Sequence, residues 1–102
     1  MKQNSGYITI PKALLWNKSF LKLSSSAKVL LLYLLALSNS FRSAQFFQYH
    51  NEIEKVLGFS RISMWRFSNE LSKLGIQFYS QNKQYIFNLD SFFAKWSEAK
   101  KF

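Results

Sequence analysis

Two helical patterns separated by a short turn place the strongest constraint on how this chain can fold. Across residues 51–57, apolar side chains recur at three- and four-residue spacings, which is the period of an amphipathic helix. Gly58 then provides a helix C-cap, and Ser60 can cap a second helix that we expect over residues 61–74. Two helices joined by a glycine-containing turn of about three residues predict a helix-turn-helix over about residues 50–75.

Two strand-like stretches follow this motif. Residues 76–80 and 84–88 are aromatic and β-branched, and the polar segment 81–83 between them is short enough for a hairpin turn. We therefore expect a β-hairpin over about residues 76–89, in the position of a wing beside the second helix. A further short strand is expected over residues 45–48.

The end of the chain has the pattern of one more helix. Asp90 is a good N-cap, and we expect the helix over about residues 91–101. Phe92, Phe93 and Trp96 form its apolar stripe. This stripe must be covered either by the core of the same chain or by a partner.

The first part of the chain combines a short alternating segment with a long apolar one. Residues 7–10 predict a short edge strand that Pro11 ends, and a helical turn is expected over residues 12–16. Serines precede residues 27–37, which are apolar on nearly every face of the expected helix, and residues 38–44 predict a loop. Such a helix has to be buried on several sides or shared with another subunit.

Together these elements predict a single domain over residues 1–102, of the α+β class and mainly helical. The expected architecture is a winged helix-turn-helix, with a three-helix core, short β-strands, a C-terminal β-hairpin as the wing and an additional C-terminal helix. The length of 102 residues and the hydrophobic content of 48% are sufficient for one core without disulfides or metal.

The charge balance favours a polyanionic partner. The chain has 14 Lys and Arg against 5 Asp and Glu, which gives a formal net charge of +9. The longest apolar run, residues 29–37, is shorter than the roughly 18 residues that a membrane span needs. Residues 1–6 are not followed by an apolar export signal. We therefore expect a cytoplasmic protein with no membrane partner.

No residue pattern indicates catalysis, a metal or a cofactor. The absence of cysteine excludes thiol catalysis and thiolate ligation. The single histidine, His50, lies beside Asn51 at a helix start, where local hydrogen bonding or simple exposure is its expected role. The five carboxylates are widely spread, and the three glycines form no phosphate-binding loop. We expect no enzyme, and no catalytic, cofactor-binding or metal-binding residues.

The second helix of the predicted motif has the chemistry of a DNA-reading surface. One row of its residues is expected to face the core: Met64, Phe67, Leu71 and Leu74. The opposite row is expected to face outward: Arg61, Ile62, Trp65, Arg66, Asn69 and Lys73. Arginine can bridge guanine, asparagine can bridge adenine, and an apolar side chain can contact a thymine methyl group. The second helix of a helix-turn-helix presents such residues to the major groove, so the outward row is predicted to bind duplex DNA.

Three more residues complete the predicted DNA-binding set. Ser60 and Ser63 lie at the start of the second helix, where hydroxyl groups and backbone amides can donate to phosphate, although capping is the favoured role of Ser60. Lys83 at the hairpin tip can reach phosphate or the neighbouring minor groove. For Trp65 two roles stay open, a DNA contact or packing against the wing or a partner subunit.

Several short motifs between residues 7 and 80 share their order and spacing with a known family. They are Ile10-Pro11-Lys12, Leu23-Ser24 leading to Ala27-Lys28 and Leu31-Leu32-Tyr33-Leu34-Leu35, Glu52-Ile53-Glu54-Lys55 with Leu57-Gly58-Phe59-Ser60, and Glu70-Leu71 before Leu74-Gly75-Ile76. In these motifs the chain resembles the N-terminal winged-helix domain of plasmid and phage replication initiators of the RepA type. The resemblance implies a recognition helix over residues 61–73, a wing over residues 81–84, and binding of repeated origin sequences, often as dimers.

We expect one domain only, without the second module that such initiators carry, which is a departure from this family. A regulator or accessory protein of a mobile element therefore fits the chain as well as an initiator does. We expect sequence-specific binding of double-stranded DNA in transcription or replication control of a prokaryotic plasmid, phage or other mobile element.

Other functions stay open alongside this expectation, because a fold does not guarantee a function. One is a protein-interaction module that docks a replication or transcription protein through Trp65, Phe92, Phe93 and Trp96. A homodimer is a further hypothesis, motivated by the apolar residues 27–37 and by the aromatic stripe near the C-terminus. Binding of RNA or single strands is disfavoured because the aromatic residues follow core periodicities and do not gather on one open sheet face.

Overall fold

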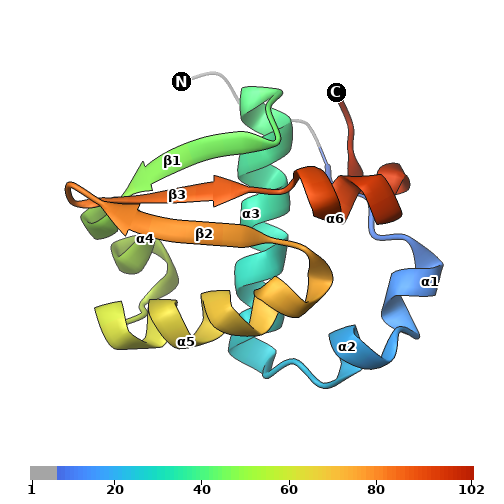
Figure 1. Ribbon diagram of the computed structural model, residues 1–102, viewed down its shortest axis with the longest axis horizontal. Helices are drawn as coiled ribbons and strands as arrows, with labels where there is room; N and C mark the ends of the chain where they lie inside the picture. Colours follow the sequence, from blue (N-terminus) through green and yellow to red (C-terminus); the bar gives the residue numbers. More distant parts are fainter. Residues whose placement is uncertain (1–6) are drawn as a thin grey trace.

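Helices supply most of the structure, and a small sheet lies across the longest of them (Figure 1). The computed structural model describes residues 7–102, so the interpretation that no export signal begins at residues 1–6 lies outside the described part of the chain. The sheet has three antiparallel strands in the order β1-β3-β2, and the expected α+β, mainly helical class is confirmed. In chain order the elements are α1 (Lys12–Leu15), α2 (Lys18–Leu21), α3 (Ser25–Phe41), β1 (Gln45–Tyr49), α4 (His50–Leu57), α5 (Arg61–Leu71), the 3₁₀ turn η1 (Ser72–Leu74), β2 (Gln77–Gln81), β3 (Gln84–Asn88), α6 (Asp90–Lys95) and the 3₁₀ turn η2 (Ser97–Ala99).

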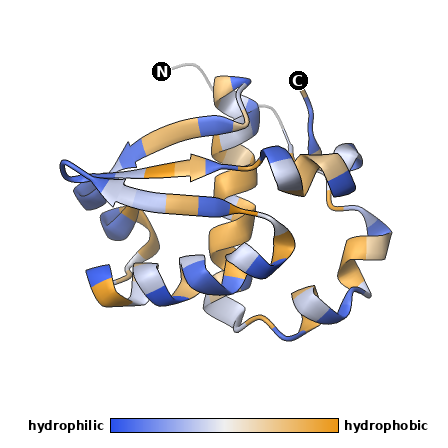
Figure 2. Ribbon diagram, in the orientation of Figure 1, coloured by the Kyte–Doolittle hydropathy of each residue, from blue (hydrophilic) through white to orange (hydrophobic). Residues whose placement is uncertain are grey.

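Helix α3 is the centre of the core. The Ser24 hydroxyl caps it by accepting a hydrogen bond from a first-turn amide at 3.2 Å, and Figure 2 shows the helix as predominantly hydrophobic. Four of its leucines have no exposed surface: Leu30, Leu31, Leu34 and Leu35. The predicted loop over residues 38–44 is wrong in its first part, because α3 continues to Phe41. Ser38 can remain in the buried helix because its hydroxyl donates to the carbonyl of Ser43 at 2.6 Å.

The sheet turns one row of aromatic side chains toward the core. Phe46, Phe87 and Phe78 are cross-strand neighbours; the first two are buried and the third is half-buried. The hairpin turn consists of Asn82 and Lys83, which have φ angles of 51° and 65°. Positive φ at both positions is the signature of a type I′ turn, whose twist matches that of the strands. The expected hairpin is therefore confirmed, with a two-residue tip.

The C-terminal segment is helical over a shorter range than its sequence predicts. Helix α6 ends at Lys95, and η2 follows it, so the predicted helix over residues 91–101 is wrong in its second half. Asp90 is the first helical residue and not the N-cap. Its carboxylate accepts a hydrogen bond from the Gln45 side chain at 2.8 Å, which attaches α6 to β1.

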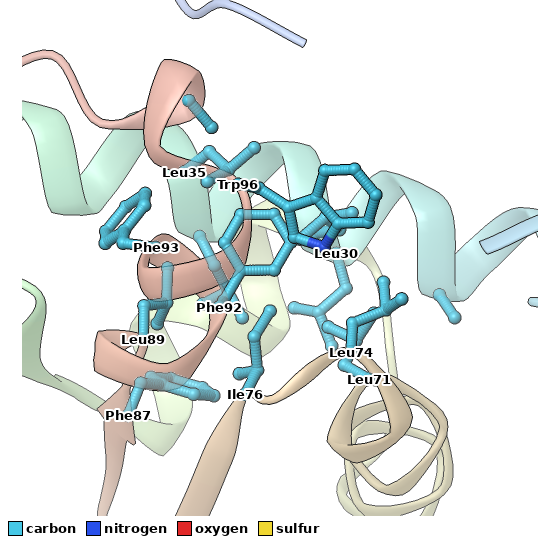
Figure 3. Packing of buried hydrophobic residues seen from close by; sticks show 14 of the residues in the cluster. Leu30, Leu35, Leu71, Leu74, Ile76, Phe87, Leu89, Phe92, Phe93 and Trp96 are labelled. Atoms are coloured by element: carbon cyan, nitrogen blue, oxygen red, sulfur yellow. The ribbon is translucent and has the colours of Figure 1, made fainter. Parts of the chain in front are cut away.

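The aromatic stripe of α6 packs into the core of its own chain. Phe92 has no exposed surface, and only 5% of Phe93 and 9% of Trp96 are exposed. Figure 3 shows these rings beside leucines of α3 and of the α5–η1 segment. The stripe therefore has a partner within the chain, which removes one of the two sequence arguments for a homodimer.

The N-terminal edge strand expected over residues 7–10 is wrong. These residues belong to no strand, and within residues 7–102 the sheet consists of β1, β2 and β3. Ile8 and Ile10 are half-buried against the core. Their alternation reflects this one-sided packing, which needs no hydrogen-bonded neighbour strand.

Candidate nucleic-acid interface

Helices α4 and α5 are joined by the short turn that the sequence predicts. Gly58 ends α4 with a φ of 72°, a left-handed conformation that glycine adopts without strain. The Ser60 hydroxyl accepts a hydrogen bond from the Ser63 amide at 3.1 Å and so caps α5. Phe59 and Phe67 meet edge to face with ring centroids 4.9 Å apart, which fixes the angle at which the chain enters α5.

The predicted helix over residues 61–74 is α-helical only to Leu71, and the 3₁₀ turn η1 forms its last three residues. Together, α5 and η1 separate their side chains onto the two faces that the periodicity predicts. Met64, Leu71 and Leu74 are buried and Phe67 is half-buried, so the inward row is confirmed. Ser68 also lies on this face and is buried, although the apolar pattern gave no sign of it. The outward row is exposed throughout: Arg61, Ile62, Trp65, Arg66, Asn69 and Lys73.

Two residues of the outward row rest on aromatic neighbours. Trp65 meets Phe78 of β2 edge to face, with ring centroids 4.9 Å apart, and 44% of its surface stays exposed. The packing of Trp65 against the hairpin is therefore observed. The Arg66 guanidinium lies 5.6 Å from the ring centroid of Phe67, close enough for a cation–π contact that orients it.

A polar cluster joins α4, α5 and the hairpin. The Glu54 carboxylate accepts from the Nε of Arg61 and from the hydroxyl of Tyr85, each at 2.6 Å through the same oxygen. Arg61, predicted as a DNA contact, is thus also part of an internal ion pair. The same arrangement brings together groups far apart in sequence, which no local pattern indicates. We call His50, Glu54, Arg61, Ser80 and Tyr85 the junction cluster.

The protonation of the junction cluster follows from these contacts. Partial burial opposes the charge of Glu54, but hydrogen bonds from Arg61 and Tyr85 outweigh it and hold the pKa of the carboxyl below its ordinary value. The hydrogen bond and the charge of Glu54 raise the pKa of Arg61. Burial, together with the hydrogen bond to Glu54, raises the pKa of Tyr85. The ion pair is therefore formed at neutral pH.

His50 is buried beneath the hairpin. Only 7% of its surface is exposed, its Nε2 lies 2.8 Å from the Ser80 hydroxyl, and its ring lies 4.2 Å from that of Tyr85 between centroids. Local hydrogen bonding was one of the two roles expected for this histidine, but its partner lies on β2 and not beside it in sequence. Simple exposure, the other expected role, is wrong because the hairpin covers the ring.

Lys83 places the hairpin tip next to the start of α4. Its carbonyl accepts a hydrogen bond from the His50 amide at 2.9 Å, while its side chain is exposed. A hollow of about 330 Å³ opens at this point, between the hairpin tip and the starts of α4 and α5. Its walls are formed by Tyr49, His50, Asn51, Arg61 and Lys83. Two residues of the predicted DNA-binding set, Arg61 and Lys83, therefore share one hollow.

The sheet face turned away from the core carries exposed aromatic rings. Phe47, Ile86 and Tyr79 form a cross-strand row, in which Phe47 is 48% and Tyr79 is 54% exposed, and Tyr49 meets Phe47 edge to face. The remaining positions of this face are amides: Gln45, Gln77, Gln81, Gln84 and Asn88. The expectation that no open sheet face gathers aromatic residues is therefore wrong. None of these nine positions is charged.

The protein-docking surface expected from the sequence is not formed as described. Of its four aromatic residues, Phe92, Phe93 and Trp96 lie in the core, and only Trp65 is exposed. The apolar stripe of α6 is visible in the sequence, but the element that covers it is not.

Comparisons of the chain with protein-family models, with curated proteins and with solved structures found no match. Among residues 7–102, no group of three or more His, Asp or Glu side chains gathers closely enough to hold a metal ion. In the same part of the chain, no helix is both long and apolar enough to cross a membrane.

Proposed function

We propose that the protein is a winged helix-turn-helix that binds double-stranded DNA sequence-specifically, without catalysis. In this proposal α3, α4 and α5 are the three-helix core, α5 is the recognition helix, and the β2–β3 hairpin is the wing. The observed succession of these elements supports it. The net charge of +9 supports a polyanionic partner. We place the protein in the cytoplasm of a prokaryote, in transcription or replication control of a plasmid, phage or other mobile element.

The observation that carries this proposal is the outward face of α5. Arg66 and Asn69 are exposed side by side on it and offer hydrogen bonds that discriminate guanine and adenine. Ile62, with 77% of its surface exposed, is an apolar group without a core role and suits contact with a thymine methyl group. The one carboxylate of this helix, Glu70, is turned away and binds the backbone amide and hydroxyl of Ser24. No acidic side chain of α5 therefore points from this face toward a phosphate backbone, and the Glu54 carboxylate of α4 is paired with Arg61.

The first experiment is selection of binding sites from a mixed pool of short duplexes, at low and at moderate salt. We expect one sequence to be enriched and the affinity to fall steeply with salt, because phosphate contacts by Lys and Arg release counterions. The double variant Arg66→Ala, Lys73→Ala should lose most of this binding. Asn69→Ala should keep the salt dependence but relax the choice of one base, at a cost of about 1–3 kcal/mol of discrimination.

A matched control removes the same charge elsewhere. Lys100→Ala, Lys101→Ala also removes two positive charges, at the C-terminus, which lies on the side of the molecule opposite α5 (Figure 1). This variant should bind the selected duplex nearly as well as the wild type. Equal losses in the two double variants would mean that only net charge matters, and no duplex binding at low salt would refute the proposal.

A second candidate function is docking of another protein on the outer face of the sheet. The exposed rings of Phe47, Tyr49 and Tyr79 and the absence of charge on this face resemble the central part of a protein interface. Single-strand binding combines aromatic rings with a positively charged groove, and this face offers the rings without the cations. Docking through this face should be lost in Phe47→Ala, Tyr79→Ala and should change little with salt.

We also propose that the protein forms a homodimer through the exposed side of α3. Val29 is 49% and Leu32 is 41% exposed on this side, and the exposed Ala36 lies one turn further along. A homodimer predicts half-sites spaced by about one helical turn of DNA or a multiple of it. A monomeric mass at micromolar concentration, measured by sedimentation, would refute it.

A further inference from the structure

The hollow between the hairpin tip and the starts of α4 and α5 has the composition of an anion site. Arg61 and Lys83 bring two positive charges to it from different elements, and Asn51 and Tyr49 add an amide and a hydroxyl. The Nε of Arg61 is engaged by Glu54, which leaves the terminal N–H groups of the guanidinium for another acceptor. The volume of the hollow, about 330 Å³, is ample for a tetrahedral oxyanion.

One residue that lines this hollow, His50, has a buried ring nitrogen without a partner in the described part of the chain. His50 is more than nine-tenths buried, and its Nδ1 has no hydrogen-bond partner among residues 7–102, although its Nε2 contacts Ser80. A buried polar atom without a partner destabilises the folded protein. In the tautomer whose Nε2 accepts from the Ser80 hydroxyl, Nδ1 carries the ring proton.

The first turn of α4, which borders the hollow, adds backbone hydrogen-bond donors. The N-cap residue, Tyr49, makes no side-chain capping bond, so the side-chain partner that first-turn amides often find is missing here. The His50 amide is satisfied by the Lys83 carbonyl. The amides of Asn51 and Glu52 follow it in the first turn, where backbone N–H groups and the helix dipole favour an anion.

The carboxylates near the hollow leave it positive. The Glu54 carboxylate forms an ion pair with Arg61 and accepts a second hydrogen bond from Tyr85. Glu52 lines a different hollow, on the side of β1. Neither carboxylate is among the residues that line the hollow. Because Glu54 balances the charge of Arg61, Lys83 supplies the net positive charge that a phosphate there would meet.

We propose that this hollow binds one phosphate group of the DNA backbone and thereby ties the hairpin tip to the start of α5. The inference rests on the proposed binding of duplex DNA and adds the position of one specific phosphate. Phosphate contacts fix the register of a protein on the duplex. Here the contact joins the two elements that must approach the DNA together, because Lys83 belongs to the hairpin and Arg61 to α5.

The test uses the full chain and the duplex selected above, and it measures affinity over a series of salt concentrations. Lys83→Gln should lower the slope of log K against log salt by about one unit, since one phosphate contact is lost. The control is Lys55→Gln, an exposed lysine of α4 that does not line the hollow; its slope should stay at the wild-type value.

A scan with single methylphosphonate linkages then locates the phosphate. Neutralising one phosphate in each binding site should weaken the wild type and should have little further effect on Lys83→Gln, because both changes remove the same contact. The inference is overturned if Lys83→Gln behaves like Lys55→Gln, or if every methylphosphonate acts equally on wild type and variant. Absence of duplex binding by the wild type would instead refute the proposed function itself.

Discussion

The packing around α6 and the junction cluster hold the molecule together in different ways. Around α6, the fully buried Phe92 and its neighbours contact the core mainly through apolar surface. In the junction cluster, Glu54 and His50 hold α4, α5 and the hairpin through a few directed hydrogen bonds. Apolar burial supplies most of the free energy of folding, whereas individual hydrogen bonds and ion pairs contribute less and fix geometry.

This difference assigns separate roles to the two regions. The α6 region should determine whether the chain folds, and the junction cluster should determine how the hairpin and α5 are oriented. Substitutions around α6 should therefore mainly lower stability, whereas substitutions in the junction cluster should mainly affect DNA binding.

The largest loss of stability is expected for Phe92→Ala. Removing a fully buried ring loses its transfer free energy and leaves a cavity, at a cost of about 3–5 kcal/mol. Chemical denaturation followed by circular dichroism measures it. The control Tyr79→Ala, on the open sheet face, should stay within about 0.5 kcal/mol of the wild type. Similar losses in both variants would show that α6 is no more important to folding than the outer face.

A smaller loss of stability is expected for Gly75→Ala, because the added methyl group would contact the backbone of α6. A Cβ at this position would lie 3.1 Å from the Phe92 amide nitrogen, and the residue has a φ of 93°, so strain and crowding together should cost about 2–3 kcal/mol. Gly58→Ala has a φ of 72° and nothing within 4 Å, so only the strain of about 1 kcal/mol applies. The two melting temperatures should differ accordingly, and equal values would contradict the crowding.

In the junction cluster, Glu54→Gln should cost about 1–2 kcal/mol at neutral pH, because it weakens two charge-assisted hydrogen bonds. Since the pKa of Glu54 is lowered in the folded protein, its contribution is full above the ordinary value of 4.5 and is lost as the pH falls through the lower folded value. The difference between wild type and Glu54→Gln should therefore shrink below pH 4.5. A constant difference from pH 7 to pH 3 would contradict the ion pair.

The smallest effect is expected at the start of α5, where capping and DNA contact can be separated. Ser60→Ala removes the cap of α5 and should cost about 1 kcal/mol, with DNA affinity largely kept. Ser60→Asp can keep the cap, but it places a negative charge beside the proposed DNA face, so stability should hold while duplex binding weakens. Parallel changes in stability and binding would mean that Ser60 acts on DNA only through the fold.

The helices and strands could be predicted from the sequence where a cap residue or a regular apolar spacing marked them clearly. The glycine after α4, the serine before α5 and the spacing of Met64 and Leu71 indicated both helices and the two faces of α5. The sequence was misleading where tertiary packing competes with local preference. Residues 7–10 alternate like a strand but pack on one side without pairing, and Trp96 leaves the helical conformation where its ring is buried.

What the sequence by itself determined is the class of fold, the hairpin and the exposed row on α5, because helical period, caps and turn residues act within a few positions of each other. The tertiary structure alone decided three contacts: α6 covers its own aromatic stripe, Glu54 binds Arg61 and Tyr85, and His50 lies under the hairpin. The physical reason is the large sequence separation between the partners. These contacts join residues brought together only when the hairpin and helices pack, and their energies depend on burial and on geometry that no local pattern contains.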